Sequence, residues 1–307
     1  MKWTIGYSYS LVLAALVLAI TVSVFSGPTD LLGVSDVIGW LSGDESERLD
    51  KAWLVFWELR LPRVLLAVGV GSALAISGVL LQSFFKNPLA EPYILGVSSG
   101  AGFGAVVWSF FVTGWVGVTN GSMIVAFVGA VLAVVLVLFI SRNRGVVLNH
   151  KLLLAGVAIN VFFASLTTGL LLNAQTDQFR ALLHWLMGSV AHKGWWEVQV
   201  LMPIVLGVGL VSLRYWKSLD WISLDENSAF TAGVFVNRVR WVILVLATVL
   251  ASTSVAICGS IAFVGLMVPH AVRYFSGASH RHLIPLSGIG GSLLVLVSDY
   301  LGKNISP

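Results

Sequence analysis

Long apolar runs separated by short polar segments are the main pattern of this sequence. A helix needs about 20 apolar residues to cross the hydrocarbon core of a membrane. The runs that meet this length predict nine spans, at 8–26, 63–84, 93–113, 122–140, 151–172, 197–214, 238–256, 259–275 and 284–301. Because the runs are continuous rather than alternating, they favour helices and exclude a membrane β-barrel. We therefore expect an all-α integral membrane protein, a polytopic bundle of about nine spans in one transmembrane domain over 1–307.

Composition supports the same class. Of the 307 residues, 57% are hydrophobic and 10% are charged, whereas a soluble domain carries about 25% charged residues. The net charge is +4, and the basic residues lie in short loops rather than on one polar face, which argues against binding of nucleic acid. The single cysteine, Cys258, excludes an internal disulfide and a cysteine-based metal site.

The distribution of basic residues predicts the orientation of the chain. With the N-terminus in the cytoplasm, 11 of the 18 Lys and Arg residues fall on the cytoplasmic side and seven on the other, as the positive-inside rule requires. This orientation makes residues 27–58 an outer, periplasmic loop and residues 215–240 a cytoplasmic loop. Within the cytoplasmic loop, Ser223 or Asp225 is expected to cap the start of a short helix that Gly233 ends.

A third polar segment, 173–196, predicts a short amphipathic helix at the outer surface. Its tryptophans, Trp185, Trp195 and Trp196, are expected at the level of the lipid headgroups. The spans themselves are rich in small residues, and the chain has 31 glycines. Small residues let helix backbones approach closely in lipid, so we expect a tightly packed bundle.

The sequence carries no motif for catalysis, for a cofactor or for a metal. It has no G-x-x-x-x-G-K-[ST] loop for ATP, no H-E-x-x-H and no G-x-S-x-G. The spans are almost free of charge, apart from Arg273 and Asp299 near their ends. A porter coupled to protons or ions usually needs a buried carboxylate, so this pattern favours a transporter whose energy comes from another protein.

Five segments in order carry a family resemblance. They are LRLPR at 59–63, SGVLLQSFFKNPLAEPYILGVSSGAG at 77–102, LLLAGVAIN at 152–160, GSIAFVGLMVPHAVR at 259–273 and SHRHLIPLSGIGG at 279–291. The sequence resembles the FecCD-type permease subunits of bacterial ABC importers for iron chelates, haem and cobalamin, and 59–102 is particularly similar to the cobalamin permeases. The resemblance implies the permease fold of a type II importer. That family has ten spans, against nine predicted in this sequence, which ends at SDYLGKNISP.

The resemblance also implies partners and a location. They are a second permease subunit in a homodimer, two separate ABC ATPase subunits and a periplasmic substrate-binding protein, all in or at the lipid of the bacterial inner membrane. The cargo would be an iron–siderophore, haem or cobalamin. The sequence itself leaves the cargo open and allows an oxyanion as well.

Three sets of residues match functional positions of the family. Docking of the binding protein would use Arg60, Arg63 and Lys303. Coupling to the ATPase would use Leu224, Asp225, Glu226, Ala229, Gly233 and Val234. The translocation path would be lined by Asn160, Thr167, Thr168, Asn173 and Gln175.

Simpler interpretations remain open for these residues and for the whole chain. Arg60 and Arg63 could be membrane-interface anchors, and the 215–240 segment could be an ordinary interfacial loop. The alternative function is a secondary transporter coupled to ions or protons. A third is a membrane scaffold that transports nothing.

Overall fold

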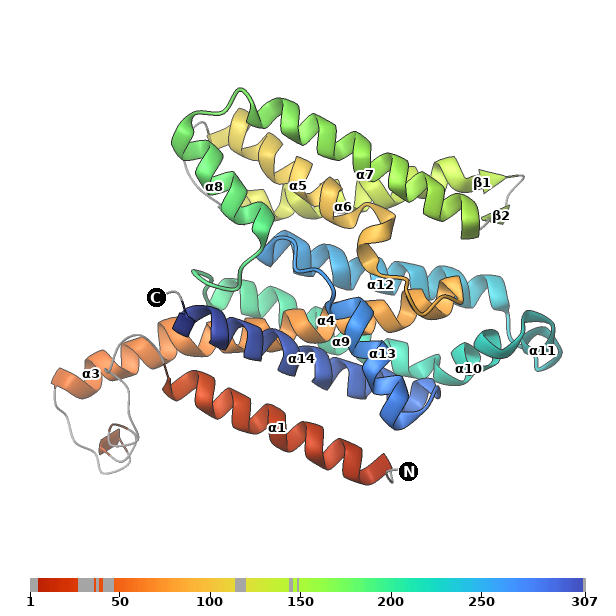
Figure 1. Cartoon of the computed structure of the whole chain (residues 1–307), viewed down its shortest axis with the longest axis horizontal. Coiled ribbons are helices and arrows are strands. Elements are labelled where there is room, and N and C mark those ends of the chain that lie inside the picture. Colours follow the sequence, from red (N-terminus) through yellow and green to blue (C-terminus); the bar gives the residue numbers. More distant parts are fainter. Residues whose placement is uncertain are drawn as a thin grey trace.

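Seven long helices form the frame of the structure, which is a computed structural model. It describes residues 5–26, 36, 39–40, 47–113, 120–143, 146–147 and 149–305. Within this part of the chain, seven helices are long and apolar enough to cross a membrane. They contain α1 (Ile5–Phe25), α4 (Leu61–Phe85), α6 (Asn120–Ser141), α7 (Asn149–Leu171), α9 (Trp195–Arg214), α12 (Val236–Cys258) and α14 (His280–Ile305). Figure 1 shows them lying side by side, which confirms the predicted all-α class.

Shorter elements connect the long helices. Before α4 come α3 (Glu47–Leu54) and the π-helix η1 (Val55–Arg60), and after it come the 3₁₀ helix η2 (Pro92–Leu95), α5 (Val97–Trp108) and the π-helix η3 (Ser109–Thr113). A two-stranded ladder, β1 (Arg142–Asn143) and β2 (Val146–Val147), separates α6 from α7. The remaining short helices are α8 (Thr176–Met187), α10 (Trp216–Leu224), α11 (Glu226–Thr231) and α13 (Val264–Ser276).

Seven of the nine predicted spans coincide with the long helices, and the other two are shortened by turns. In the 93–113 run, Gly96 adopts a φ of +83° and separates η2 from α5. In the 259–275 run, Gly259 and Phe263 have φ values of +72° and +68°, so α13 begins at Val264. Its 13 residues reach about 20 Å at 1.5 Å per residue, short of the roughly 30 Å of the hydrocarbon core.

Part of the predicted outer loop, 27–58, is helical. Residues 47–60 form α3 and η1 and run into α4 without a break, giving a continuous helical segment over Leu49–Phe85. Apolar contacts hold this extension in place, because Ala52 is fully buried and the ring centroids of Trp57 and of Trp195 in α9 lie 4.8 Å apart. The rest of the loop lies almost entirely outside the described residues.

The amphipathic segment 173–196 contains the expected short helix, α8, but its tryptophans differ in burial. Trp196 is 54% exposed, whereas Trp185 is 7% exposed and belongs to the core. Trp185 therefore packs inside the bundle instead of facing the lipid headgroups, and only Trp196 is exposed as the prediction requires. The cause is a close backbone contact, since a Cβ on Gly259 would overlap the carbonyl oxygen of Trp185.

Helix α4 lies at the centre of the bundle. In its most apolar window 83% of the residues are buried, against 17% for α1 and 22% for α9. It packs against α14, α12, α13 and α9. The contact with α14 is a backbone contact, because a Cβ on Gly71 would overlap the carbonyl oxygen of Gly291, and a Cβ on Gly291 would overlap that of Gly71. Here small residues are a steric requirement.

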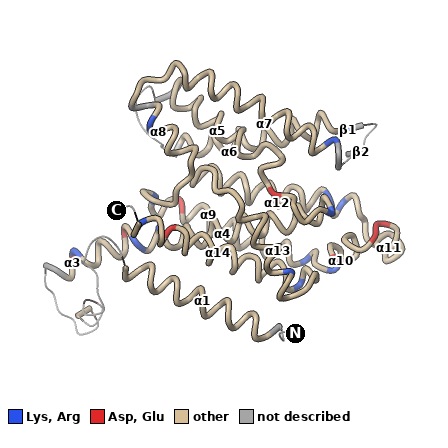
Figure 2. Tube along the Cα trace, in the orientation of Figure 1, with Lys and Arg blue, Asp and Glu red and all other residues tan. Residues whose placement is uncertain are grey.

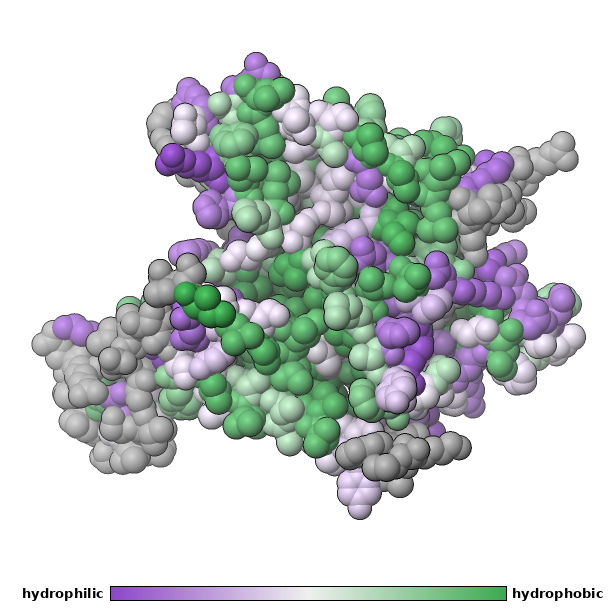
Figure 3. All heavy atoms as spheres, viewed as in Figure 1, coloured by the Kyte–Doolittle hydropathy of each residue, from purple (hydrophilic) through white to green (hydrophobic). Residues whose placement is uncertain are grey.

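Charged residues gather at the two ends of the bundle and leave its middle apolar, as Figures 2 and 3 show. We call one end the Arg63 end, where Arg60, Arg63 and Lys303 lie, and the other the Asp225 end, where α10 and α11 lie. Helices α4 and α14 run antiparallel between the two ends (Figure 1).

Replacing Gly291 by alanine should destabilise the protein. The new Cβ would push α4 and α14 apart, and overpacking of this kind costs about 1–3 kcal/mol. We expect a lower midpoint of thermal unfolding for purified protein in detergent. The matched control is Gly207→Ala in α9, where an added Cβ meets no atom within 4 Å; equal midpoints for the two variants would contradict the contact.

Candidate functional site

A cavity of about 870 Å³ opens at the Arg63 end of the bundle. Its walls are the linker 187–192 between α8 and α9, the segment 260–264 at the start of α13, and the last turns of α14. The polar wall residues are Arg63, Ser189, His192, Ser260, Ser298, Asp299 and Lys303. The apolar ones include Met187, Ile261, Phe263, Met267 and Leu294. Binding sites for small molecules are typically clefts of about 300–1,000 Å³ with mixed linings of this kind.

Two glycines shape the wall opposite α14. Gly188 has a φ of +76° and Gly259 a φ of +72°, a region that favours glycine. The two lie against each other, since a Cβ on Gly259 would come within 2.9 Å of the Gly188 Cα. The Ser189 amide donates a hydrogen bond of 2.7 Å to the Cys258 carbonyl. The linker after α8 is therefore fastened to the segment that precedes α13.

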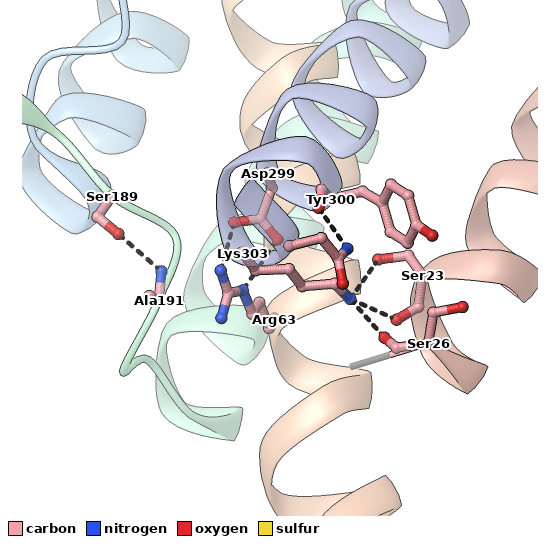
Figure 4. A network of polar contacts seen from close by, with 9 residues as sticks. Ser23, Ser26, Arg63, Ser189, Ala191, Asp299, Tyr300 and Lys303 are labelled. Atoms are coloured by element: carbon pink, nitrogen blue, oxygen red, sulfur yellow. Dashed lines mark hydrogen bonds and ion pairs between the residues drawn. The ribbon is translucent and has the colours of Figure 1, made fainter. Parts of the chain in front are cut away.

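Arg63 and Asp299 form a bidentate ion pair on the cavity wall (Figure 4). Arg63 Nε lies 2.9 Å from Asp299 Oδ2, and Arg63 Nη2 lies 2.8 Å from Asp299 Oδ1. The side chain of Arg63 is 30% exposed and that of Asp299 is 9% exposed. The pair joins the first turn of α4 to the end of α14, and it neutralises the one carboxylate among the residues that line the cavity.

The other two predicted docking residues bind the end of α1. Lys303 Nζ donates to the carbonyl oxygens of Ser23 and Ser26, each at 2.8 Å, as Figure 4 shows. Arg60 Nη1 donates to the carbonyl oxygens of Val24 and Phe25, at 2.8 Å and 3.1 Å. The last carbonyls of a helix have no partner within it, and basic side chains are favourable there. Arg60 is buried, so in this structure it caps α1.

The predicted path residues lie on or just after α7, away from this cavity. Asn160 is internal, because its Nδ2 donates to the Tyr93 carbonyl and its Oδ1 accepts from Ser99, at 3.0 Å and 2.7 Å. Thr167 is buried. The exposed ones are Thr168 and Asn173, which bond back to their own helix, and Gln175, which precedes α8.

At the Asp225 end, the predicted helix is present as α11, and the structure selects Asp225 over Ser223 as its N-cap. Asp225 Oδ2 accepts a hydrogen bond of 3.0 Å from the Ser228 amide. This hydrogen bond to the carboxylate lowers the pKa of Asp225 below its usual value. Gly233 follows the helix with a φ of +79°, as expected for a terminating glycine.

The other predicted coupling residues divide into buried and exposed positions. Ala229 is fully buried, and the Val234 amide donates to its carbonyl oxygen at 2.9 Å. Leu224 is 76% exposed. Glu226 pairs with Arg240 at 2.7 Å and with Lys86, at the end of α4, at 3.3 Å. Helix α11 therefore projects from the bundle on a short connection and is tied to it at Glu226.

The described residues hold no group of three or more His, Cys, Asp or Glu side chains placed to bind a metal ion.

Sequence reasoning missed most of the cavity wall. Asp299 stands out in the sequence as a rare charge near the end of an apolar run, but its partner Arg63 is 236 positions away. Ser189 and Ser260 lie in segments without a regular period, so no local pattern identifies them. Their position follows from the glycine contacts at Gly188 and Gly259.

Comparisons with known proteins agree on one family. The model of the FecCD transport family matches residues 15–307. The cobalamin import system permease protein BtuC of Halobacterium salinarum is 37% identical over 260 residues, covering 83% of this chain and 68% of that protein. The Fe(3+) dicitrate transport system permease protein FecD of Escherichia coli is 38% identical over 268 residues, covering 87% and 80%. A solved structure described as an inward-facing ABC transporter of the metal-chelate type has a TM-score of 0.85 at 29% identity, covering 98% and 91%.

Asp225→Ala should loosen α11. Without the carboxylate, the Ser228 amide loses its acceptor, and hydrogen exchange in 228–231 should become faster. The protection depends on the ionised carboxylate, so it should be complete above the ordinary pKa of an aspartate and disappear as the pH falls through the lowered pKa. Ser223→Ala is the matched control, and faster exchange in that variant would contradict the assignment of the cap.

Proposed function

The chain belongs to the FecCD transport family and is a permease subunit of an ABC importer, and we propose that it carries a metal chelate or cobalamin across the bacterial inner membrane. The observation that carries the proposal is the arrangement of two sites at opposite ends of one bundle. A cavity lies at the Arg63 end, and a capped helix projects at the Asp225 end. Helices α4 and α14 extend between them.

A separate substrate-binding protein would dock at the Arg63 end. Arg63 and Lys303 line the cavity and are partly exposed, so carboxylates of that protein could reach them. Guanidinium and carboxylate groups pair in a bidentate manner, and an incoming carboxylate would compete with Asp299 for Arg63. Lys303 would contribute charge without the fork of an arginine. Arg60 would act indirectly, by holding α1 beside the site.

Two separate ATPase subunits would bind at the Asp225 end, one on each permease subunit. Leu224 and Phe230 present exposed apolar side chains on either side of Asp225, at 76% and 77% exposure. Such side chains suit a groove on a partner protein. The sequence has no P-loop, which supports an ATP site on another chain.

A second copy of the chain would complete the path. Thr168, Asn173 and Gln175 lie exposed along α7 and at its end, and in a homodimer this face would line a route between the two subunits. Asn160 and Thr167 would support that face from inside. The remaining apolar surface, such as Leu154 and Phe139 at 73% and 78% exposure, suits contact with lipid.

The cavity favours a bulky cargo of neutral to anionic charge. Arg63 and Asp299 neutralise each other, which leaves Lys303 as the cation and a wall that is largely apolar. Relatives of this chain are named for cobalamin and for Fe(3+) dicitrate. Both are large chelates, which is consistent with a wide path that has few fixed charges.

Uptake into proteoliposomes tests the proposal. The permease would be reconstituted with its ATPase subunits and binding protein, and supplied with labelled cobalamin, haem, ferric dicitrate and a ferric siderophore in parallel. We expect accumulation of one of them only with ATP, and no effect of an uncoupler. Uptake that proceeds without the ATPase and collapses with an uncoupler would instead establish a secondary transporter.

Charge removal at Arg63 tests the docking surface. Arg63→Gln should lower uptake at least tenfold. The double variant Arg63→Gln with Asp299→Asn, which leaves no unpaired charge, should be equally impaired. Asp299→Asn alone keeps the arginine and should retain uptake within about threefold of wild type. Recovery of uptake in the double variant would show that Arg63 serves the fold rather than docking.

A further inference from the structure

A hydrogen-bonded cluster joins three helices near the Asp225 end, with Ser83 and His280 buried and Asp220 partly exposed. Asp220 comes from α10, His280 is the first residue of α14, and Ser83 lies in the last turn of α4. His280 Nδ1 lies 2.6 Å from Asp220 Oδ1, and His280 Nε2 lies 2.5 Å from Ser83 Oγ. The imidazole therefore bridges α10 to α4.

Asp220 also caps the start of α14. Its Oδ1 accepts from the His280 amide at 2.8 Å, and its Oδ2 accepts from the Ser279 hydroxyl at 2.9 Å. A carboxylate is favourable at a helix N-terminus. Burial opposes ionisation of Asp220, but the hydrogen bonds from His280 and Ser279 together hold the pKa of its carboxyl below its usual value. One side chain of α10 thus bonds to three groups of Ser279 and His280, at the start of α14.

Ser83, His280 and Asp220 are linked in the same way as the serine, histidine and aspartate of a hydrolytic triad. The surroundings of the cluster exclude a catalytic role. The Ser83 hydroxyl and the imidazole of His280 are each 3% exposed. Ser83 Oγ also donates to the Val79 carbonyl oxygen at 2.9 Å, within its own helix. A nucleophile must be reached by its substrate, and this hydroxyl is enclosed by protein. The cluster holds helices together.

We propose that Asp220 and His280 are positioning residues that fix α10, and with it the coupling helix α11, to the pair of helices α4 and α14. Asp225 ends α10 and caps α11, so the position of α11 follows that of α10. At their other ends, α4 and α14 carry Arg63, Asp299 and Lys303. A displacement of α11 is therefore passed directly to the helices that form the cavity wall.

The ion pairs of Glu226 are a weaker connection of α11 to the bundle. The side chain of Glu226 is 44% exposed, and those of its partners Lys86 and Arg240 are 33% and 18% exposed, so both pairs are partly open to water. Exposed ion pairs contribute little and are screened by salt. Loss of a partner in the Asp220–His280–Ser83 cluster costs more, because it leaves polar groups of the buried Ser83 and His280 unpaired. Of these two polar attachments, the cluster is therefore the stronger.

The inference rests on the proposed function, and its test uses the same reconstituted complex of permease, ATPase subunits and binding protein. Three rates are compared: basal ATP hydrolysis, hydrolysis stimulated by the loaded binding protein, and cargo uptake. For Asp220→Ala we expect at least a tenfold loss of uptake and of stimulation, with basal hydrolysis within twofold of wild type. Asp220→Asn keeps an oxygen acceptor for His280 and should recover uptake to within threefold.

The matched control is Lys217→Ala, an exposed position of the same helix, which should leave all three rates within twofold. If the cluster had a purely structural role, Asp220→Ala would lower the amount of assembled complex and all three rates in proportion, and this result would overturn the inference. Normal uptake by the Asp220→Ala variant would overturn it as well. If the Asp220→Ala variant does not assemble, the Ser83→Ala variant tests the inference instead. It removes the bond between Ser83 and His280 and leaves Asp220 in place as the cap of α14. We expect it to lower the ratio of stimulated to basal hydrolysis at least threefold; an unchanged ratio would overturn the inference. If the wild type itself shows no ATP-dependent uptake, the proposed function fails rather than the role of the cluster.

Discussion

The close approach of α4 and α14 at Gly71 and Gly291 is the constraint on which the rest of the structure depends. Neither residue can carry a side chain without overlap with the carbonyl oxygen of the other. In lipid, helices gain little from hydrophobic association with each other, and close backbone packing is a main source of attraction. The contact places α14 along the most buried helix of the bundle and sets the distance between Arg63 and Asp299 at one end and between Ser83 and His280 at the other.

The two ends use polar contacts of different strength. Hydrogen bonds that involve a charged group contribute about 1.5–3 kcal/mol, whereas an exposed ion pair contributes about 0–1 kcal/mol. The Asp220–His280–Ser83 cluster, in which His280 and Ser83 are buried, and the bidentate Arg63–Asp299 pair belong to the first kind. The pairs of Glu226 belong to the second. Between these two firm attachments, α4 and α14 form a connection from the cavity to the projecting helix α11.

Local patterns in the sequence predict the parts of this fold that depend on local physics. Hydropathy locates seven long helices, and the choice of cap residues places α11 between Asp225 and Gly233. The same reasoning does not anticipate the turns at Gly96 and Gly259, because glycine within an apolar run also suits close helix packing. Nor does it reveal that Arg60 caps α1, since the carbonyls concerned lie 35 and 36 positions away. The Asp220–His280 contact spans 60 positions and has no sequence signature.

The most direct test of the account asks whether α4 and α14 move as one body during transport. Ser72 and Gly288 face each other across the two helices, with the Ser72 hydroxyl 3.0 Å from the position of a Cβ on Gly288. A cysteine pair at these positions, in a Cys258→Ser background, can be oxidised in the reconstituted complex. The measurement is ATP-driven uptake before and after oxidation, with the extent of the cross-link determined on the same sample. The account predicts equal rates. A block that appears on oxidation and is reversed by reductant would show that the two helices must slide past each other, and would contradict it.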